Sequence, residues 1–396
     1  MPRSRAAVSH AVPQPSPWTR ETGSSLALAV EVLIHGPLAR TELARRLDLS
    51  QASLTRLSAP LLASGLLVEL DDRVDGRAGR PSRPLDVVPE SRHFVGVKLT
   101  GDDVVGVVTD LRANVLGSAS RDLPDTSPEA VADMVAEVVA ELRALVPQVT
   151  AVGVGIGGLV RDYTNVVSAP FLHWEDVALG PLLAARTGLP TVIENDVVTL
   201  TEAEHWFGSG RDLDRFAVLT IGAGIGYGAV VHGGIVVSDD SGLGLVGHWP
   251  LEPDGPSCGE GHRGCAQAML ASPSIVDAVS GGLGRPLTYD QCLNLAEAGD
   301  PVARPVVEAA GRALGRLMAA VGNLLVPERI ILAGEGVRLA EVAADSVREG
   351  IARDRNARAH PLDYVVNDPD ATQWCRGAAV IAIQTYVLGA HPAPAA

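Results

Sequence analysis

Three metal-binding side chains fall close together in this chain of 396 residues. His248, Cys258 and Cys265 surround a glycine-rich loop, CGEGHRGC. Thiolate and imidazole groups at this spacing suit a structural Zn²⁺ ion, which prefers four ligands. Glu260 or His262 would have to supply the fourth ligand, and without it the metal would be weakly bound or absent. The sequence therefore predicts a zinc site of His248, Cys258, Cys265 and Glu260, with His262 as the alternative to Glu260.

An amide and a carboxylate stand side by side at the end of a predicted strand, residues 190–196. Asn195 and Asp196 together offer donors and acceptors for hydroxyl groups, and Asp196 could deprotonate one of them. The same local pattern fits a helix cap, because Asn and Asp before a helix accept its first backbone N–H groups. Both interpretations stay open at this stage.

Four glycine-bearing turns follow predicted strands, at residues 155–158, 222–226, 242–247 and 334–336. Glycine in such a turn lets backbone N–H groups approach a phosphate or a sugar closely. One turn of this kind is weak evidence. Four in this order are more specific and favour a ligand cleft.

The first part of the chain predicts three short helices, over residues 26–34, 42–47 and 50–61, because leucines recur on one face of each. Ser50 can cap the third helix, and Pro60 should break or kink it. A strand after Gly65 and a Gly/Pro/Arg stretch complete an arrangement that resembles a winged helix-turn-helix.

Such a module would place its third helix in the major groove of DNA. Arg56 can pair with guanine and Gln51 with adenine, whereas Arg45 suits a phosphate. A small helical protein-interaction module is the alternative. The residues predicted to contact DNA are Arg45, Gln51, Ser53, Thr55, Arg56, Arg77 and Arg80.

Charge is distributed unevenly along the chain. The formal net charge is −15, yet residues 1–60 hold seven arginines against four carboxylates. A weakly basic first part on an acidic remainder indicates separate partners. No apolar run reaches the roughly 18 residues of a membrane span, and no secretory signal is recognisable. Four cysteines are too few for a disulfide scaffold, so we expect a cytoplasmic protein without a membrane partner.

The rest of the chain predicts an α/β body with two lobes. Strands over 94–99, 104–110 and 114–120 are followed by alternating helices and strands, and a second strand group opens at 216–222. The expected organisation is a disordered tail (1–20), a DNA-binding domain (21–89), a first lobe (93–200, with a returning helix at 372–390) and a second lobe (201–371).

These stretches together resemble the ROK family (repressors, open reading frames, kinases), from about Leu26 to about Tyr386. The motifs that carry the resemblance are GVGIGGLV (153–160), VIENDVV (192–198), LTIGAGIGYGAVVHGG (219–234), GLVGHWPL (244–251), CGEGHRGC (258–265) and NLLVPERIILAGEGV (323–337). The resemblance implies a two-lobed, actin-like ATPase fold with a sugar cleft, zinc beside the cleft, and assembly as dimers or tetramers. A winged helix-turn-helix before that body is the layout of the family's sugar-responsive regulators.

Departures from the family's kinases bear on activity. The resemblance places Lys98 where the kinases carry an aspartate that holds ATP phosphates. Asp102 and Asp103 follow, and their charges would repel a triphosphate at short range. Asp196 matches the kinases' catalytic base and would be vestigial here. We therefore expect no enzyme activity.

The sugar motif also departs from the family pattern. Leu245 and Gln267 replace two glutamates of that pattern. Losing one charged acceptor would cost about 1.5–3 kcal/mol of binding free energy. We therefore expect a less hydroxylated or amino-substituted sugar, a sugar phosphate, or no tightly bound effector. The residues that the resemblance assigns to the ligand are Gly157, Gly158, Asn195, Asp196, His248 and Gln267.

The leading hypothesis is a homo-oligomeric repressor that binds a palindromic operator and senses a carbohydrate without phosphorylating it. One alternative is an ATP-dependent sugar kinase with an appended DNA-binding domain. Another is a DNA-bound architectural regulator whose body only dimerises, a reading that Leu245 and Gln267 favour.

Overall fold

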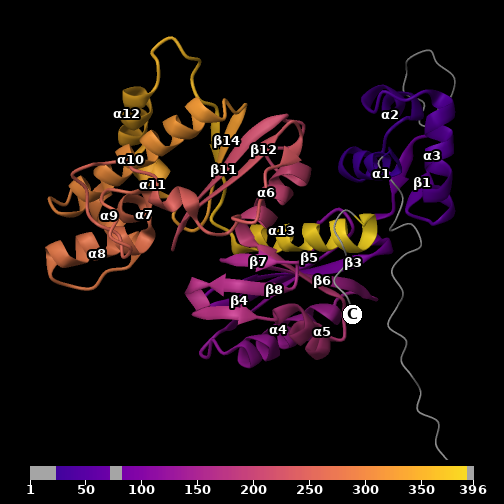
Figure 1. Ribbon diagram of the computed structural model, residues 1–396, viewed down its shortest axis with the longest axis horizontal. Helices are drawn as coiled ribbons and strands as arrows, with labels where there is room; N and C mark the ends of the chain where they lie inside the picture. Colours follow the sequence, from indigo (N-terminus) through magenta and orange to yellow (C-terminus); the bar gives the residue numbers. More distant parts are fainter. Residues whose placement is uncertain (1–23, 72–82, 390–396) are drawn as a thin grey trace, which may run out of the picture. The chain divides into compact units, whose positions relative to one another are not determined.

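The computed structural model describes residues 24–71 and 83–389, which divide into two compact units (Figure 1). The first unit, called the head, comprises the described chain up to Ser91 together with residues 383–389. The second, called the body, spans Arg92–Ala382. Residues 1–20 and the predicted DNA contacts Arg77 and Arg80 lie outside the described residues. Within 24–71 and 83–389, no helix has the length and apolar character needed to cross a membrane.

Over residues 24–71 and 83–91, the head shows three helices, a short 3-10 turn and a two-stranded antiparallel sheet. Their bounds are α1 (Ser24–His35), α2 (Arg40–Arg46), α3 (Gln51–Ala63), β1 (Leu67–Glu69), β2 (Leu85–Val87) and η1 (Pro89–Ser91). Leu28, Leu43, Leu54 and Leu61 are buried between these elements. Burial of each such side chain contributes about 1.5–3 kcal/mol, so this small core holds the helices together. The three predicted helices and the strand are present.

The start of helix α3 at its N-cap and its continuation past Pro60 each have a local explanation. The Ser50 side chain accepts a hydrogen bond from the Ser53 backbone N–H at 3.1 Å, as predicted for an N-cap. Pro60 was predicted to break or kink this helix, and the break is wrong, because the helix runs on to Ala63. Proline removes the hydrogen bond to the carbonyl of Arg56, four residues before it, and its ring crowds that carbonyl. Arg56 is exposed, so water can reach this part of the helix.

The first lobe of the body is built on a five-stranded sheet in the order β10-β6-β3-β4-β5. Strands β10, β6 and β3 are parallel, and β4 and β5 are added antiparallel. The carboxyl ends of β10, β6 and β3 therefore meet at one edge of the sheet. The bounds are β3 (His93–Leu99), β4 (Asp103–Thr109), β5 (Val115–Asp122), β6 (Val149–Ile156), β10 (Thr191–Asn195), α4 (Pro128–Arg143), α5 (Leu179–Thr187) and α6 (Asp196–Phe207).

A helix from the far end of the sequence, α13 (Ala371–Ile383), lies against this sheet (Figure 1). Two glycines make room for it. A Cβ atom on Gly96 of β3 would lie 1.9 Å from the carbonyl oxygen of Cys375, and one on Gly153 of β6 would lie 1.9 Å from that of Ala378. Only glycine permits so close an approach of helix and sheet. The chain continues from α13 into a π-helical turn, η4 (Gln384–Leu388).

A small three-stranded antiparallel sheet, absent from the sequence predictions, is inserted in the first lobe between β6 and α5. Its order is β7-β8-β9. Its bounds are β7 (Leu159–Arg161), β8 (Asn165–Ala169), η2 (Pro170–Leu172) and β9 (Trp174–Val177).

The second lobe repeats the plan with a sheet in the order β13-β12-β11-β14-β15, in which β11, β14 and β15 are parallel. The ends of β11 and β14 thus lie side by side. The strand bounds are β11 (Arg215–Ile221), β12 (Ile225–Val231), β13 (Gly234–Ile235), β14 (Arg329–Ala333) and β15 (Tyr364–Val366). The helix bounds are η3 (Leu245–His248), α7 (Ala266–Leu270), α8 (Ser272–Leu283), α9 (Tyr289–Glu297), α10 (Ala303–Leu324), α11 (Leu339–Val342) and α12 (Ala344–Asp354).

Candidate functional site

The exposed face of α3 in the head carries the residues that could contact bases. Gln51, Thr55 and Arg56 are all exposed there. The Thr55 hydroxyl donates to the Gln51 carbonyl at 3.0 Å, which leaves the Thr55 methyl group for contact. Ser53 is half-buried and belongs to the N-terminal cap, since its hydroxyl accepts from the Ser50 hydroxyl at 3.0 Å. The face thus offers one amide, one methyl group and one guanidinium to a partner.

Arg45, predicted to contact a phosphate, lies on α2 and is 71% exposed. It donates to Glu42 at 2.6 Å, and Arg46 donates to the same carboxylate at 2.9 Å. Hydrogen bonds from Arg45 and Arg46 lower the pKa of Glu42 to about 2, so this carboxylate stays ionised. Part of the positive charge of α2 is therefore already compensated within the head.

Asn195, at the end of β10, serves mainly as a helix cap. Its Oδ1 accepts from the backbone N–H groups of Val197 at 3.0 Å and Val198 at 3.2 Å, and its Nδ2 donates to the Gly158 carbonyl at 3.0 Å. The capping interpretation of the sequence therefore holds for Asn195. A ligand here would have to bind an amide already engaged in three hydrogen bonds.

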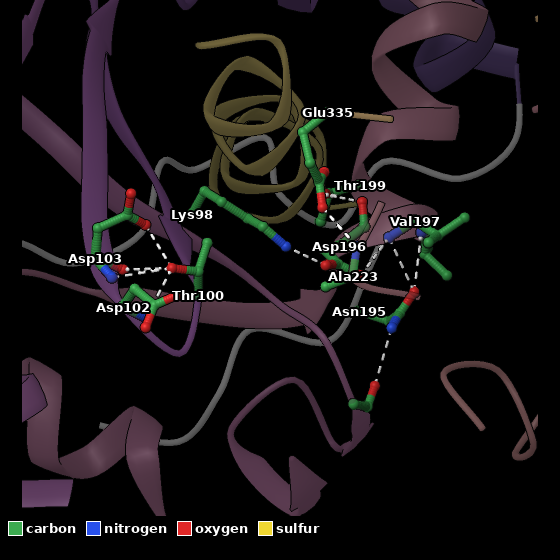
Figure 2. Close-up of polar contacts among 12 residues, drawn as sticks. Lys98, Thr100, Asp102, Asp103, Asn195, Asp196, Val197, Thr199, Ala223 and Glu335 are labelled. Atoms are coloured by element: carbon green, nitrogen blue, oxygen red, sulfur yellow. Dashed lines mark hydrogen bonds and ion pairs between the residues drawn. The ribbon is translucent and has the colours of Figure 1, made fainter. Parts of the chain in front are cut away.

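Asp196, the next residue, places a carboxylate at this edge of the sheet. Its Oδ2 accepts a hydrogen bond from the Lys98 ammonium group, and both side chains are 12% exposed (Figure 2). The Lys98 nitrogen also lies 4.7 Å from the centre of the Trp374 ring on α13, a cation–π contact. A carboxylate held by an ammonium group in this way can accept a hydroxyl hydrogen bond but is a poor general base.

Residues of both lobes meet beside this pair. The ring of Phe171, which is 50% exposed, lies against Gly157 of the first lobe and Gly224 of the second. The Gln267 Nε2 atom donates to the Ala223 carbonyl at 3.2 Å rather than to Asp196. An aromatic face thus lies beside a charged pair where the two lobes meet.

Gly158 and Leu245, both singled out in the sequence, differ in their surroundings. Gly158 approaches the second lobe, since a Cβ on Gly242 would lie 2.1 Å from the Gly158 carbonyl oxygen. Leu245 stands 67% exposed at the start of η3. An exposed leucine offers no hydrogen bond, so this position contributes only apolar contact. Two cavities of about 230 and 380 Å³ are lined by other residues, none of them predicted to bind the ligand.

The turn between β3 and β4 is closed by its own side chains. The Thr100 hydroxyl accepts from the backbone N–H groups of Asp102 at 3.1 Å and Asp103 at 2.9 Å, and it donates to the Asp103 carboxylate (Figure 2). Backbone N–H groups of such a turn are the donors that a phosphate would need. Here they are already satisfied.

The potential metal ligands lie on the loop after η3. His248, Cys258 and His262 have ligand atoms within 4.8 Å of one another, with Cys258 Sγ 3.8 Å from His248 Nδ1 and 3.7 Å from His262 Nδ1. Glu260, predicted to complete the site, does not join this cluster. Its carboxylate lies 3.1 Å from Nε2 of His248, on the ring edge opposite to Cys258. The loop turns at Gly261, which separates the two side chains.

The two cysteines of this loop differ in ionisation. Burial works to raise the pKa of Cys258, but hydrogen bonds from the Glu260 backbone and the His262 side chain outweigh it and lower the pKa to about 7. Burial, together with the neighbouring Cys258, raises the pKa of Cys265. Cys265 is buried and does not join the cluster of His248, Cys258 and His262. Three N and S ligands at these distances fit Zn²⁺, which prefers a fourth ligand.

Next to Asn195 lies a partly buried carboxyl group, Glu194, that the sequence did not single out. Burial, together with the charge of Glu202, raises the pKa of Glu194 to about 7, against a smaller opposing effect of the Asn195 backbone N–H. That N–H donates to Glu194 Oε1 at 2.6 Å. The protonation of Glu194 is therefore linked to the residue that caps α6.

Head and body together define a class: a winged helix-turn-helix joined to a two-lobed, sugar-kinase-type body. The chain belongs to the ROK family, whose pattern matches residues 94–385.

The relatives of this chain include both a transcriptional regulator and a sugar kinase. The chain is similar to the DNA-binding transcriptional dual regulator NagC of Escherichia coli, with 28% identity over 317 residues, 76% of this chain and 77% of NagC. It is also similar to a glucokinase of Thermotoga maritima, with 32% identity over 277 residues, 65% of this chain and 86% of the glucokinase.

Among solved structures, the fold is similar to that of a ROK family transcriptional regulator described as a homolog of the E. coli Mlc protein. The TM-score is 0.77 at 26% identity, over 92% of this chain and 97% of the other. Coverage of 92% exceeds the share of the chain in the body alone, so the likeness takes in residues of the head as well.

Proposed function

We propose that this protein is a DNA-binding transcriptional repressor that responds to a carbohydrate and does not phosphorylate it. The observation that carries the proposal is the combination of an exposed recognition helix in the head with a body whose Asp196 is bound to Lys98. NagC and the Mlc homolog, which the chain resembles over most of its length, are named as transcriptional regulators.

In the head, Arg56 and Gln51 would read base edges in the major groove, and Arg45 would hold a phosphate. Ser53 would act by fixing the start of α3. The part of the wing that holds Arg77 and Arg80 remains a proposal drawn from the sequence alone. The proposed DNA-binding domain is residues 21–89.

In the body, the carbohydrate would bind between the first lobe (93–200, with 372–390) and the second lobe (201–371). Asp196 would accept a hydroxyl hydrogen bond, and Gly157, Gly158 and Phe171 would border the ring. Binding would favour one of two lobe arrangements and so change operator affinity. We propose that the cytoplasmic protein acts as a homodimer or tetramer, since a palindromic operator matches a two-fold symmetric protein.

The metal proposed at the loop is a structural Zn²⁺, held by His248, Cys258 and His262 with Cys265 as the fourth ligand. Glu260 would then orient His248 by accepting from its other ring nitrogen, the usual second contact of a metal-bound histidine. The ion would fix the loop that follows η3 and borders the cleft.

Binding to the DNA upstream of the protein's own gene tests the head. Fluorescence anisotropy should give a specific complex, and Arg56→Ala should weaken it ten- to a hundredfold, the effect of losing about 1–3 kcal/mol from one base contact. Arg348→Ala removes the same charge from an exposed position of α12 and should leave affinity unchanged. Equal binding by wild type and Arg56→Ala would reject the recognition helix.

The kinase alternative is favoured by one observation, the presence of Asp196 at the end of β10 in a chain similar to a glucokinase. Incubation with MgATP and a panel of hexoses distinguishes the two functions. We expect no sugar phosphate. Turnover that disappears in Asp196→Ala would establish a kinase instead. Calorimetry with the same sugars tests the effector, and the absence of any binder at millimolar concentration would favour a body that only assembles the protein.

A further inference from the structure

The glycine turn at the end of β11 holds a carboxylate from the chain itself. Strands β11 and β14 are parallel neighbours, so the turn at residues 222–226 lies beside the turn at residues 334–336. The second turn contains one charged side chain, Glu335. Its Oε1 accepts a hydrogen bond from the Ala223 backbone N–H at 2.6 Å, between residues 112 positions apart (Figure 2).

The space for this carboxylate is provided by Gly222. A Cβ atom at Gly222 would lie 2.0 Å from Glu335 Oε1 and 2.4 Å from Oε2, so any other residue would displace the carboxylate. A hydrogen bond from a backbone N–H to an ionised oxygen is stronger than one to a neutral acceptor. Gly222 and Glu335 therefore form a matched pair, in which one residue leaves the space that the other fills.

An anion at this turn would need the donor that Glu335 already holds. Backbone N–H groups in glycine turns bind phosphate oxygens because they offer a concave set of donors. In this protein the Ala223 N–H is occupied by a carboxylate oxygen, and in the first lobe the N–H groups of Asp102 and Asp103 are occupied by Thr100. A phosphate approaching the second-lobe turn would also meet the negative charge of Glu335.

We propose that Glu335 is a built-in anion that occupies the phosphate position of the 222–226 turn and thereby excludes nucleotides and other polyphosphates from the body. The inference deepens the proposed function, in which the body binds a carbohydrate without a nucleotide. It assigns that selectivity to a second-lobe residue, separate from Lys98 in the first lobe.

The test is calorimetric titration of the full chain with inorganic pyrophosphate, a probe that needs only the turn. Glu335→Ala should bind pyrophosphate at least tenfold more tightly than wild type, because it frees the Ala223 N–H and removes the charge. Glu335→Gln should gain clearly less than Glu335→Ala, because it loses the charge but its amide oxygen can still accept that hydrogen bond. Glu341→Ala, which removes an exposed carboxylate from α11, is the matched control. It should bind pyrophosphate no more tightly than wild type does.

Three results would overturn the proposal: no gain in Glu335→Ala, an equal gain in Glu341→Ala, or a gain in Glu335→Gln as large as in Glu335→Ala. Glu335→Gly, which also removes the acceptor, repeats the measurement if Glu335→Ala loses its far-ultraviolet circular dichroism. Operator binding by Glu335→Ala should equal that of wild type. Absent DNA binding by the wild type would reject the proposed function, whereas the pyrophosphate titrations test this inference alone. The two failures can therefore be told apart.

Discussion

The ammonium group of Lys98 donates to the Oδ2 oxygen of Asp196, from residues 98 positions apart on β3 and α6. Each side chain is 12% exposed, so the two charges are largely removed from water and depend on each other. Removing one partner of a buried ion pair leaves an uncompensated charge, which costs more than the pair itself contributes.

Lys98→Met should therefore lower the free energy of unfolding by about 3 kcal/mol. The double variant Lys98→Met/Asp196→Asn should lose clearly less than the sum of the two single variants, because neither charge is left alone. Urea denaturation of the four proteins measures this coupling. Strict additivity of the single losses would contradict a coupled pair.

Replacement of Pro60 by alanine should stabilise the head. Alanine restores a backbone N–H that can bond to the Arg56 carbonyl within α3, and a proline inside a helix costs about 3 kcal/mol relative to alanine. We expect a gain of about 1–3 kcal/mol, since proline also restricts the unfolded chain. Thermal unfolding followed by circular dichroism measures the change. A lower melting temperature would mean that Pro60 makes a contact more valuable than the missing hydrogen bond.

Stability should depend on pH through Glu194. Its pKa is raised from 4.5 to about 7, so the folded protein holds this proton more tightly than the unfolded chain. The contribution is fully present below pH 4.5 and is lost as the pH rises through 7, a loss on the order of 3 kcal/mol. Glu194→Gln should remove that loss and be more stable than wild type at pH 8. Glu129→Gln, on an exposed position of α4, is the control and should leave the pH profile unchanged.

Metal analysis of the purified protein should give about one zinc per chain, and a chelator should lower its melting temperature. Variants then distinguish ligands from supporting residues. His262→Ala should abolish stoichiometric zinc, whereas Glu260→Gln should weaken zinc binding about ten- to a hundredfold, the cost of losing a contact outside the first coordination shell. The reverse order of effects would restore Glu260 as a ligand.

Local signals predicted much of this fold. The cap at Ser50 depends on neighbouring residues only, and it could be read from the sequence. The strands β7, β8 and β9 could not, because they are three to five residues long and their pairing depends on one another rather than on an alternating pattern.

The site was less predictable for a related reason. Spacing alone cannot decide between Glu260 and His262, because Gly261 lies between them. The turn of the backbone at this glycine determines which of the two side chains faces Cys258. The contact of Glu335 with Ala223 spans 112 positions. Its sequence signal, a glutamate between Gly334 and Gly336 in a turn of the kind that binds phosphate, is visible only once β11 and β14 are known to be neighbours.

Helix α13 contacts Lys98 of the charged pair near its first residue, and the body ends near the last residue of this helix. Trp374, in its first turn, lies against the Lys98 ammonium group, and the boundary between body and head falls between Ala382 and Ile383, in its last turn. About two helical turns thus separate Trp374 from the last residue of the body, Ala382. Between these two residues α13 lies on Gly96 and Gly153, where nothing larger than a hydrogen atom fits, so displacing Lys98 would strain the packing of α13 on its own sheet.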